Sequence, residues 1–268
     1  MIKISTFHSL YVKMAYQIIS NITTKNIPMA ERLYREIGES IKQEIAKSSL
    51  KIGDKLPTER VYAELFGVSR TLVREAFIML EIEELIEVRK GSGSYLKNNL
   101  SLKTSHKVSD VGPFELLQAR QEIESSIAAC AAPVITKQDL QKLQDILDIE
   151  SAELETVEKA NDADRDFHLS IAQATQNTVL LDTATRLWDM RDGNPMWKKL
   201  HARIQDTSYH DQWLDDHKKV LIQLRKRNAE GARQAMWQHL ENVKQTLFKL
   251  SDTDAPDFDG YLFAQPHN

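Results

Sequence analysis

Residues 56–95 have the sequence LPTERVYAELFGVSRTLVREAFIMLEIEELIEVRKGSGSY, and this stretch decides the fold of the N-terminal part of the chain. Thr58 precedes a short helical segment, and a threonine at an N-cap satisfies free N–H groups of the first turn. Gly67 ends that segment, and Ser69 caps a second helix. Four apolar residues of the second helix recur at the spacing of one buried face: Val73, Ala76, Phe77 and Leu80.

The other face of the second predicted helix is basic near its start, where Arg70 and Arg74 lie one turn apart. Two helices joined by a short turn, with cationic side chains at the start of the second, are typical of a helix-turn-helix whose second helix enters the DNA major groove. Residues 86–88 and 94–96 resemble two strands around a glycine-containing tip. The order of these parts predicts a winged helix-turn-helix.

Each part alone also has a plainer interpretation. Arg70 and Arg74 by themselves would more often belong to a solvated helix face than to a DNA contact. The Gly-Ser-Gly of the tip is usually only a turn, and it is no phosphate-binding loop because no Gly-Lys-Ser/Thr opens a helix after it. The order of the parts is far more specific than any one of them.

The same stretch resembles the N-terminal domain of GntR-type bacterial transcriptional regulators, whose pattern is LPsER.lA..fgVSR.tvREAl..Le..Glie.r.G.G.yV. The chain departs from this pattern at Leu85, where we expect the family glycine, so the turn before the wing is predicted to be tight or strained. Arginine suits bidentate contacts with guanine or phosphate, and serine and threonine suit phosphates or base edges. The resemblance implies groove contacts from Arg60, Ser69, Arg70, Thr71 and Arg74, and wing contacts from Lys90 and Gly91.

Composition limits the classes of function. The 268 residues are enough for two domains, and the formal net charge of −4 argues against a protein that coats nucleic acid through bulk charge. Any DNA binding is therefore local. The single cysteine, Cys130, excludes a disulfide framework and favours the reducing cytoplasm, and we expect it to be a small buried hydrophobe. No apolar run approaches the roughly 18 residues of a membrane span, so no membrane partner is expected.

Periodicity and composition predict a mostly α-helical chain. We hypothesise that Met29 is the physiological start, because the preceding residues lack acidic side chains and GntR relatives begin near this point. Breaks near Pro133 and at several later turns allow about six or seven helices, which predicts an all-helical antiparallel bundle with its own core. The predicted parts are an extension at 1–28, a winged helix-turn-helix domain at 29–97, a linker at 98–113, a helical effector domain at 114–250 and a tail at 251–268.

Four polar side chains are predicted to point into the bundle. Asp164 and His168 lie four residues apart on one helix side, and His217 and His239 each lie on an apolar stripe of a later helix. Burying an unpaired polar group costs roughly 1–3 kcal/mol, so several aimed at one core need partners. Any one histidine alone is more often a hydrogen-bonded core residue. The set of four favours a divalent ion with open positions, zinc first, with nickel, manganese or iron as alternatives that the ligand types do not exclude.

The helical segment resembles the FCD effector domain of the FadR subgroup of GntR regulators, which is a metal-binding type. Its motif, Asp-x-x-x-His followed by one histidine on each of two later helices, is matched by Asp164, His168, His217 and His239. The resemblance also implies that Arg120 faces the carboxylate of an effector. A salt bridge from Arg120 to Glu124, one turn further on, is an equal alternative.

A closer similarity, over nearly the whole chain from Met29, is to enterobacterial repressors of hexuronate utilisation. Residues 112–120 (GPFELLQAR) and 236–242 (MWQHLEN) carry it. It implies galacturonate or glucuronate, or a close catabolite such as tagaturonate or fructuronate, as the effector. Candidates for binding it beside Arg120 are Arg191, Asn194, Trp197, Lys198 and His201.

The leading hypothesis is a repressor that binds double-stranded DNA as a homodimer on a palindromic operator, because one small winged module makes few base contacts. A GntR-type regulator of another carboxylate, such as a gluconate-like acid or a dicarboxylate, is the first alternative. The second is a helical metal-dependent phosphohydrolase, suggested by the pair His210 and Asp211. We disfavour this enzyme, and predict no catalytic residues, because the pair lies in a polar, turn-like stretch and a second upstream histidine is missing.

Overall fold

The chain divides into two compact units. The computed structural model describes residues 33–89, 92–98, 111–152, 157–201 and 208–250. Described residues up to Gly112 belong to the first unit, and those from Pro113 onward belong to the second. The predicted extension at 1–28 and tail at 251–268 lie outside the described residues, as does most of the predicted linker. Within the described part of the chain, no helix is both long enough and apolar enough to cross a membrane.

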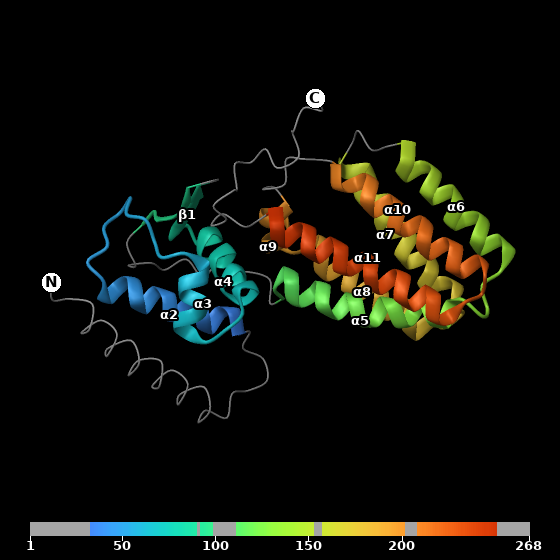
Figure 1. Ribbon diagram of the computed structural model, residues 1–268, viewed down its shortest axis with the longest axis horizontal. Coiled ribbons are helices and arrows are strands. Elements are labelled where there is room, and N and C mark those ends of the chain that lie inside the picture. The colour runs from blue at the N-terminus through green and yellow to red at the C-terminus, as the bar shows by residue number, and fades with distance from the viewer. Residues whose placement is uncertain (1–32, 90–91, 99–110, 153–156, 202–207, 251–268) are drawn as a thin grey trace, which may run out of the picture. The chain divides into compact units, whose positions relative to one another are not determined.

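Among its described residues, the first unit has three helices and a two-stranded wing (Figure 1). Helices α2 and α3 both pack against α4, and the first strand packs on α4 as well. The strands pair antiparallel, with Ile86 opposite Leu96 and Arg89 opposite Gly93. The elements are α2 (Leu33–Lys47), α3 (Glu59–Phe66), α4 (Arg70–Ile82), β1 (Ile86–Arg89) and β2 (Gly93–Leu96).

The helix ends of the helix-turn-helix lie where the sequence predicts them. The Thr58 side chain accepts a hydrogen bond from the backbone N–H of Val61, and the Ser69 side chain accepts one from Leu72, so both are N-caps. Gly67 ends α3 with φ of 66°, in the left-handed region that glycine adopts without a steric penalty. The short turn therefore sets the angle at which α4 leaves α3.

The core of the first unit is the apolar face of α4. All four predicted core residues of this helix are buried, and Val73 and Ala76 are 0% exposed. A Cβ atom at Gly38 of α2 would overlap the end of the Met79 side chain on α4. Because these two helices approach so closely, the absence of a side chain at Gly38 is part of what positions α4.

The turn before the wing differs from the prediction. Leu85 is 4% exposed and packs into the core, whereas the preceding residue, Glu84, has φ of 59°. The position that favours glycine is therefore Glu84 and not Leu85, and the sequence pattern was aligned one residue too late. A non-glycine residue in this region stores strain of about 1–2 kcal/mol, which the buried Leu85 beside it offsets by holding the turn in place.

The second unit is an all-helical bundle, as predicted. Helix α5 packs against α7, α8 and α11, and α10 packs against α6 and α11. Figure 1 shows α5 and α11 side by side. The described helices are α5 (Pro113–Ala131), α6 (Lys137–Ala152), α7 (Val157–Ala174), α8 (Thr178–Asp192), α9 (Pro195–His201), α10 (Ser208–Arg225) and α11 (Ala229–Leu250).

One expectation for this unit is wrong. Cys130 is exposed rather than buried. Its neighbours Ala129 and Ala131 are both buried, so the alanine-rich end of α5 faces the core on the sides next to Cys130. An alanine-rich segment has no strong apolar stripe, and the sequence therefore does not show which side of it packs inward.

Candidate metal centre and DNA-binding face

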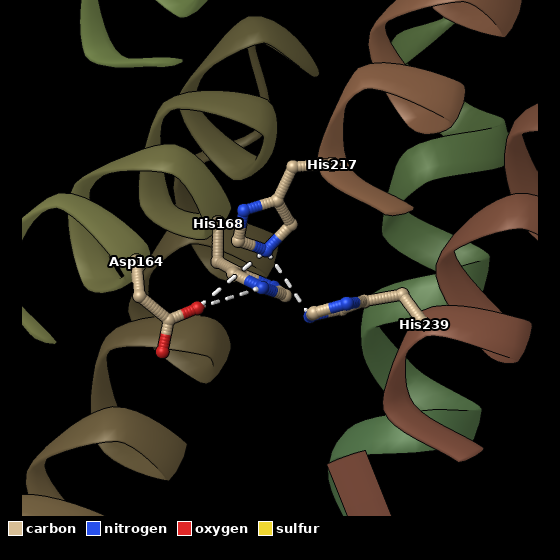
Figure 2. Close-up of side chains that lie close together, drawn as sticks. All are labelled: Asp164, His168, His217 and His239. Carbon is tan, nitrogen blue, oxygen red and sulfur yellow. Dashed lines mark hydrogen bonds and ion pairs between the residues drawn. The ribbon is translucent and has the colours of Figure 1, made fainter. Parts of the chain in front are cut away.

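The bundle brings together the four side chains predicted to hold a metal ion. Asp164 and His168 come from α7, His217 from α10 and His239 from α11, and Figure 2 shows them pointing toward one another. One ligand atom from each lies within 4.8 Å of the others. The three histidines are each 1–3% exposed. A carboxylate and three imidazoles in one buried cluster form a group that can hold a divalent metal ion.

The contacts within the cluster are close. The His217 Nε2 atom lies 3.1 Å from His239 Nε2 and 3.6 Å from an Asp164 carboxylate oxygen. His168 Nε2 lies 3.4 Å from the same oxygen (Figure 2). These nitrogens converge from three helices, so the packing of α7, α10 and α11 sets the geometry of the centre.

Two buried glutamates contact the outer nitrogens of two imidazoles, and neither contact was predicted from the sequence. The Glu150 carboxylate lies 2.9 Å from His217 Nδ1, and a Glu124 carboxylate oxygen contacts His168 Nδ1. A carboxylate on the outer nitrogen of a metal-binding histidine fixes its tautomer and the orientation of the ring. Glu150 lies on α6 and Glu124 on α5, and the spacing of residues in these helices does not show that either glutamate meets a histidine.

The charges in the centre shift the pKa values of its groups. Burial alone raises the pKa of Glu124, but Arg120 and His168 outweigh it and lower that pKa to about 2. Burial lowers the pKa of His168, yet Glu124 and Asp164 outweigh burial and raise it. Burial, together with repulsion from His217 and His168, lowers the pKa of His239 far below its usual value. His239 is therefore neutral and offers a lone pair to an ion.

Two arginines beside this cluster both stack on the indole ring of Trp188. The Arg120 guanidinium lies 4.0 Å and the Arg191 guanidinium 4.5 Å from the centre of the Trp188 ring. Arg120 also donates a 2.6 Å hydrogen bond to Glu124, so the salt bridge considered from the sequence is present. Arg191 lies 3.5 Å from an Asp164 oxygen. Trp188, whose role the sequence did not show, thus holds both cations next to the histidines.

The start of α4 presents the predicted DNA-binding residues. Arg70 and Thr71 are the first two residues of the helix, and no acidic residue lies in its first turn. Ser69 is exposed and caps the helix. Arg60 on α3 is exposed and lies 3.4 Å from Glu64. The positive end of the α4 dipole and these side chains together suit the phosphates of a duplex.

Arg74 differs from this expectation. It is 0% exposed, and its guanidinium donates two hydrogen bonds to one Glu59 oxygen, at 2.6 and 2.8 Å. Glu59 is itself 2% exposed and is the first residue of α3. The pair therefore joins the two helices of the helix-turn-helix, and Arg74 positions α4 instead of presenting its charge to solvent.

The tip of the wing is only partly described. Lys90 and Gly91, the predicted wing contacts, lie outside the described residues. Arg89, directly before them, is exposed, with its guanidinium 4.3 Å from the Tyr95 ring centre and 2.9 Å from Glu87. No DNA contact was predicted for Arg89 from the sequence. Its exposure at the end of β1 makes it a further cation on the wing.

Comparisons with known proteins place this architecture in a family. Residues 33–96 match the bacterial regulatory proteins of the gntR family, and residues 115–242 match the FCD domain. The Uxu operon regulator of Haemophilus influenzae is 52% identical over 88% of this chain and 89% of that protein. The chain belongs to the GntR family of bacterial regulatory proteins. It is a DNA-binding transcription regulator with an FCD domain, and not an enzyme.

Two Escherichia coli relatives of this GntR regulator are similar over most of their length. The Uxu operon transcriptional regulator of Escherichia coli is 45% identical, and the match covers 89% of this chain and 96% of the length of that protein. The Exu regulon transcriptional regulator is also 45% identical, over 87% of this chain and 92% of its own length. The match of all three relatives to nearly the whole chain shows that both units belong to one kind of regulator.

The remaining effector candidates of the GntR regulator have different surroundings. Asn194 is fully buried and caps α9, because its side-chain oxygen accepts hydrogen bonds from the backbone N–H groups of Met196 and Trp197. Trp197 is buried, with its ring centre 5.0 Å from the Arg191 guanidinium. Lys198 is exposed, and the side chain of His201 lies outside the described residues. Trp197 is thus linked to the metal cluster through Arg191.

The pair His210 and Asp211 does not lie in a turn. Both residues belong to α10, and His210 is 7% exposed, whereas Asp211 is exposed. The polar sequence around them suggested a loop, but helix α10 begins at Ser208. One of the two reasons given against the phosphohydrolase, the turn-like stretch, was therefore wrong, and the family assignment supports the conclusion.

Proposed function

We propose that this GntR regulator is a homodimeric repressor of genes for hexuronate catabolism, acting in the cytoplasm and released from its operator by a uronate. The observation that carries the proposal is the buried cluster of one aspartate and three histidines with two arginines beside it. The relatives named for Uxu and Exu support the choice of hexuronates. Galacturonate and glucuronate are the first candidates.

Asp164, His168, His217 and His239 would hold the ion, with zinc as the first expectation. Nitrogen and carboxylate donors also suit nickel, manganese and iron, so these four side chains can bind any of the four metals. When bound, a divalent ion supplies a positive charge that can accept oxygen ligands from an anion. Glu124 and Glu150 keep the His168 and His217 rings oriented toward the ion site.

The charges around the cluster favour an effector with one negative charge. Arg120 pairs with Glu124 and Arg191 lies beside Asp164, whereas Glu150 contacts His217. Two guanidinium groups and three carboxylates give this group one net negative charge when the imidazoles are neutral. A divalent ion changes this to one net positive charge. A buried charge without a partner is costly, and a monocarboxylate would neutralise the loaded centre. A dicarboxylate would leave it negative.

This charge balance predicts the order of effector strength. We expect galacturonate or glucuronate to weaken operator binding by about 5–150-fold, the range of ordinary allosteric coupling. Galactarate, in which a second carboxylate replaces the aldehyde group of galacturonate, should be at least about tenfold weaker as an effector, because its extra charge is not neutralised. Galactose, which has no carboxylate, should have no effect. Operator binding measured by fluorescence anisotropy checks all three, and equal operator affinity with and without every uronate contradicts the proposal.

Two copies of the first unit would read the two halves of a palindromic operator. The proposed linker at 98–113 would carry the change from the effector domain to the DNA-binding domain. By linkage, an effector that weakens DNA binding must itself bind less tightly to the DNA-bound protein.

Arg70 provides the test of the DNA-binding face. Replacing Arg70 with alanine should lower operator affinity by about 30-fold or more, because a contact of about 1–3 kcal/mol is lost in each half-site. Gel-shift titration measures the change. The matched control is Arg186→Ala on α8, an exposed arginine of the second unit, which should not change operator affinity. Full operator affinity in a folded Arg70→Ala protein would refute this assignment.

A further inference from the structure

Two ring nitrogens on α10 are buried without a hydrogen-bond partner among the described residues. They are the Nε2 atom of His210 and the Nε1 atom of Trp213, and these side chains are 7% and 8% exposed. A buried polar group without a partner costs about 1–3 kcal/mol. Two such groups one turn apart on one helix call for an explanation beyond packing.

Both residues lie on the side of α10 that carries a proposed metal ligand. His210, Trp213 and His217 follow one another at i, i+3 and i+7, which is one face of a helix. At 1.5 Å per residue, Trp213 lies about 6 Å and His210 about 10 Å along the axis from His217. The face thus extends from the metal cluster toward the first turn of α10.

The environment of His210 agrees with this placement. Burial lowers the pKa of His210. The carboxylates of Asp164 in the metal cluster, of Glu150 behind His217 and of the neighbouring Asp211 act in the opposite direction. The ring also lies 4.4 Å from the ring centre of Tyr209 and 5.9 Å from that of Trp213. His210 is therefore a neutral imidazole within electrostatic range of the cluster, enclosed by aromatic rings.

We propose that His210 and Trp213 bind the hydroxyl groups of a polyhydroxylated monocarboxylic acid whose carboxylate is held at the metal cluster and its arginines. The inference rests on the proposed effector function and adds the groups that recognise the rest of the molecule. A neutral imidazole donates one hydrogen bond and accepts another, and an indole N–H donates one. Sugar hydroxyls both donate and accept, so they match this pair, whereas a simple carboxylic acid leaves it unpartnered.

These two residues would explain selectivity that the ion and the arginines do not provide. Any small carboxylate can bind to a cation and a guanidinium. A site that hydrogen-bonds a hydroxyl group discriminates strongly against analogues that lack it, because its own polar groups then stay buried without partners. His210 and Trp213 are thus specificity residues, and they set a preference for sugar acids over short acids such as propionate.

The test is calorimetric titration of the full-length, zinc-loaded protein with galacturonate, gluconate and propionate. His210→Phe keeps a ring of similar size and should weaken the binding of the sugar acid by about tenfold, the equivalent of one hydrogen bond. Zinc content and propionate binding should not change. His210→Asn restores a donor and an acceptor and should recover part of the affinity. Trp213→Phe provides an independent second variant, and Trp237→Phe, an exposed tryptophan of α11, is the matched control.

The outcomes separate this inference from the proposed function. Equal sugar-acid affinity in the wild type, His210→Phe and Trp213→Phe overturns the inference and leaves the effector assignment intact. Gluconate binding that depends on His210, without any uronate binding, supports the inference and overturns the choice of hexuronates. Failure of the zinc-loaded wild type to bind any of these acids overturns both. An equal loss of propionate and sugar-acid affinity would show a general effect on the site and would also overturn the inference.

Discussion

Replacing Arg74 with alanine is expected to lower the free energy of unfolding of the DNA-binding unit by about 3–5 kcal/mol, because it leaves a buried carboxylate without its partner. Glu59 is 2% exposed and accepts a 2.6 Å hydrogen bond from the Arg74 guanidinium. A loss of this size is a large part of the stability of a small domain. Operator binding should be lost together with the fold, and urea denaturation of the full-length protein followed by circular dichroism measures the change.

The control for Arg74 removes both charges. A Glu59→Gln, Arg74→Met protein has no unpaired buried charge and should regain most of the lost stability. If Arg74→Ala instead folds with unchanged stability but no longer binds the operator, Arg74 contacts DNA and its buried position is not the DNA-bound one. The stability measurement thus separates a positioning residue from a DNA contact, which a binding assay alone does not.

Replacing His217 with alanine is expected to abolish stoichiometric metal retention. His217 Nε2 lies 3.1 Å from His239 Nε2 and 3.6 Å from an Asp164 oxygen, so the substitution removes a proposed ligand that lies close to two others. Elemental analysis of the purified protein measures the bound ion. A full complement of metal in His217→Ala would show that the ion, if present, is held elsewhere.

Glu150, which contacts the outer nitrogen of His217, allows a milder change to the same site. Glu150→Gln should lower metal affinity by about 10–100-fold, because the amide no longer orients the ring as the carboxylate does. Competition with a chromophoric chelator gives the affinity. Asp148→Asn, an exposed change on the same helix, is the matched control and should retain the wild-type affinity.

Local sequence was sufficient to predict the helix-turn-helix. The caps at Thr58 and Ser69 and the break at Gly67 depend on residues close to each other in the chain, and the structure confirms all three. The turn before the wing was predicted less well. The family pattern placed the strained position at Leu85, which is buried, whereas the residue with positive φ is Glu84, one position earlier.

The proposed metal ligands were predicted for a related reason. Asp164 and His168 share one helix side, and each later histidine lies on an apolar stripe, so helical periodicity alone directs them inward. The chain does bring all four together. Their partners Glu124 and Glu150 were not predicted, because which carboxylate meets which imidazole depends on how four separate helices pack.

The sequence by itself determined the helix-turn-helix with the caps at Thr58 and Ser69, and it determined that Asp164 and the three histidines point into the bundle, since these features follow from short-range spacing. Only the tertiary structure decided that Arg74 joins α3 to α4, that Trp188 carries two arginines, and that His210 is buried on the face of His217. These features depend on contacts between residues far apart in the chain or on which side of a helix is covered, and neither is encoded in the spacing of neighbouring residues.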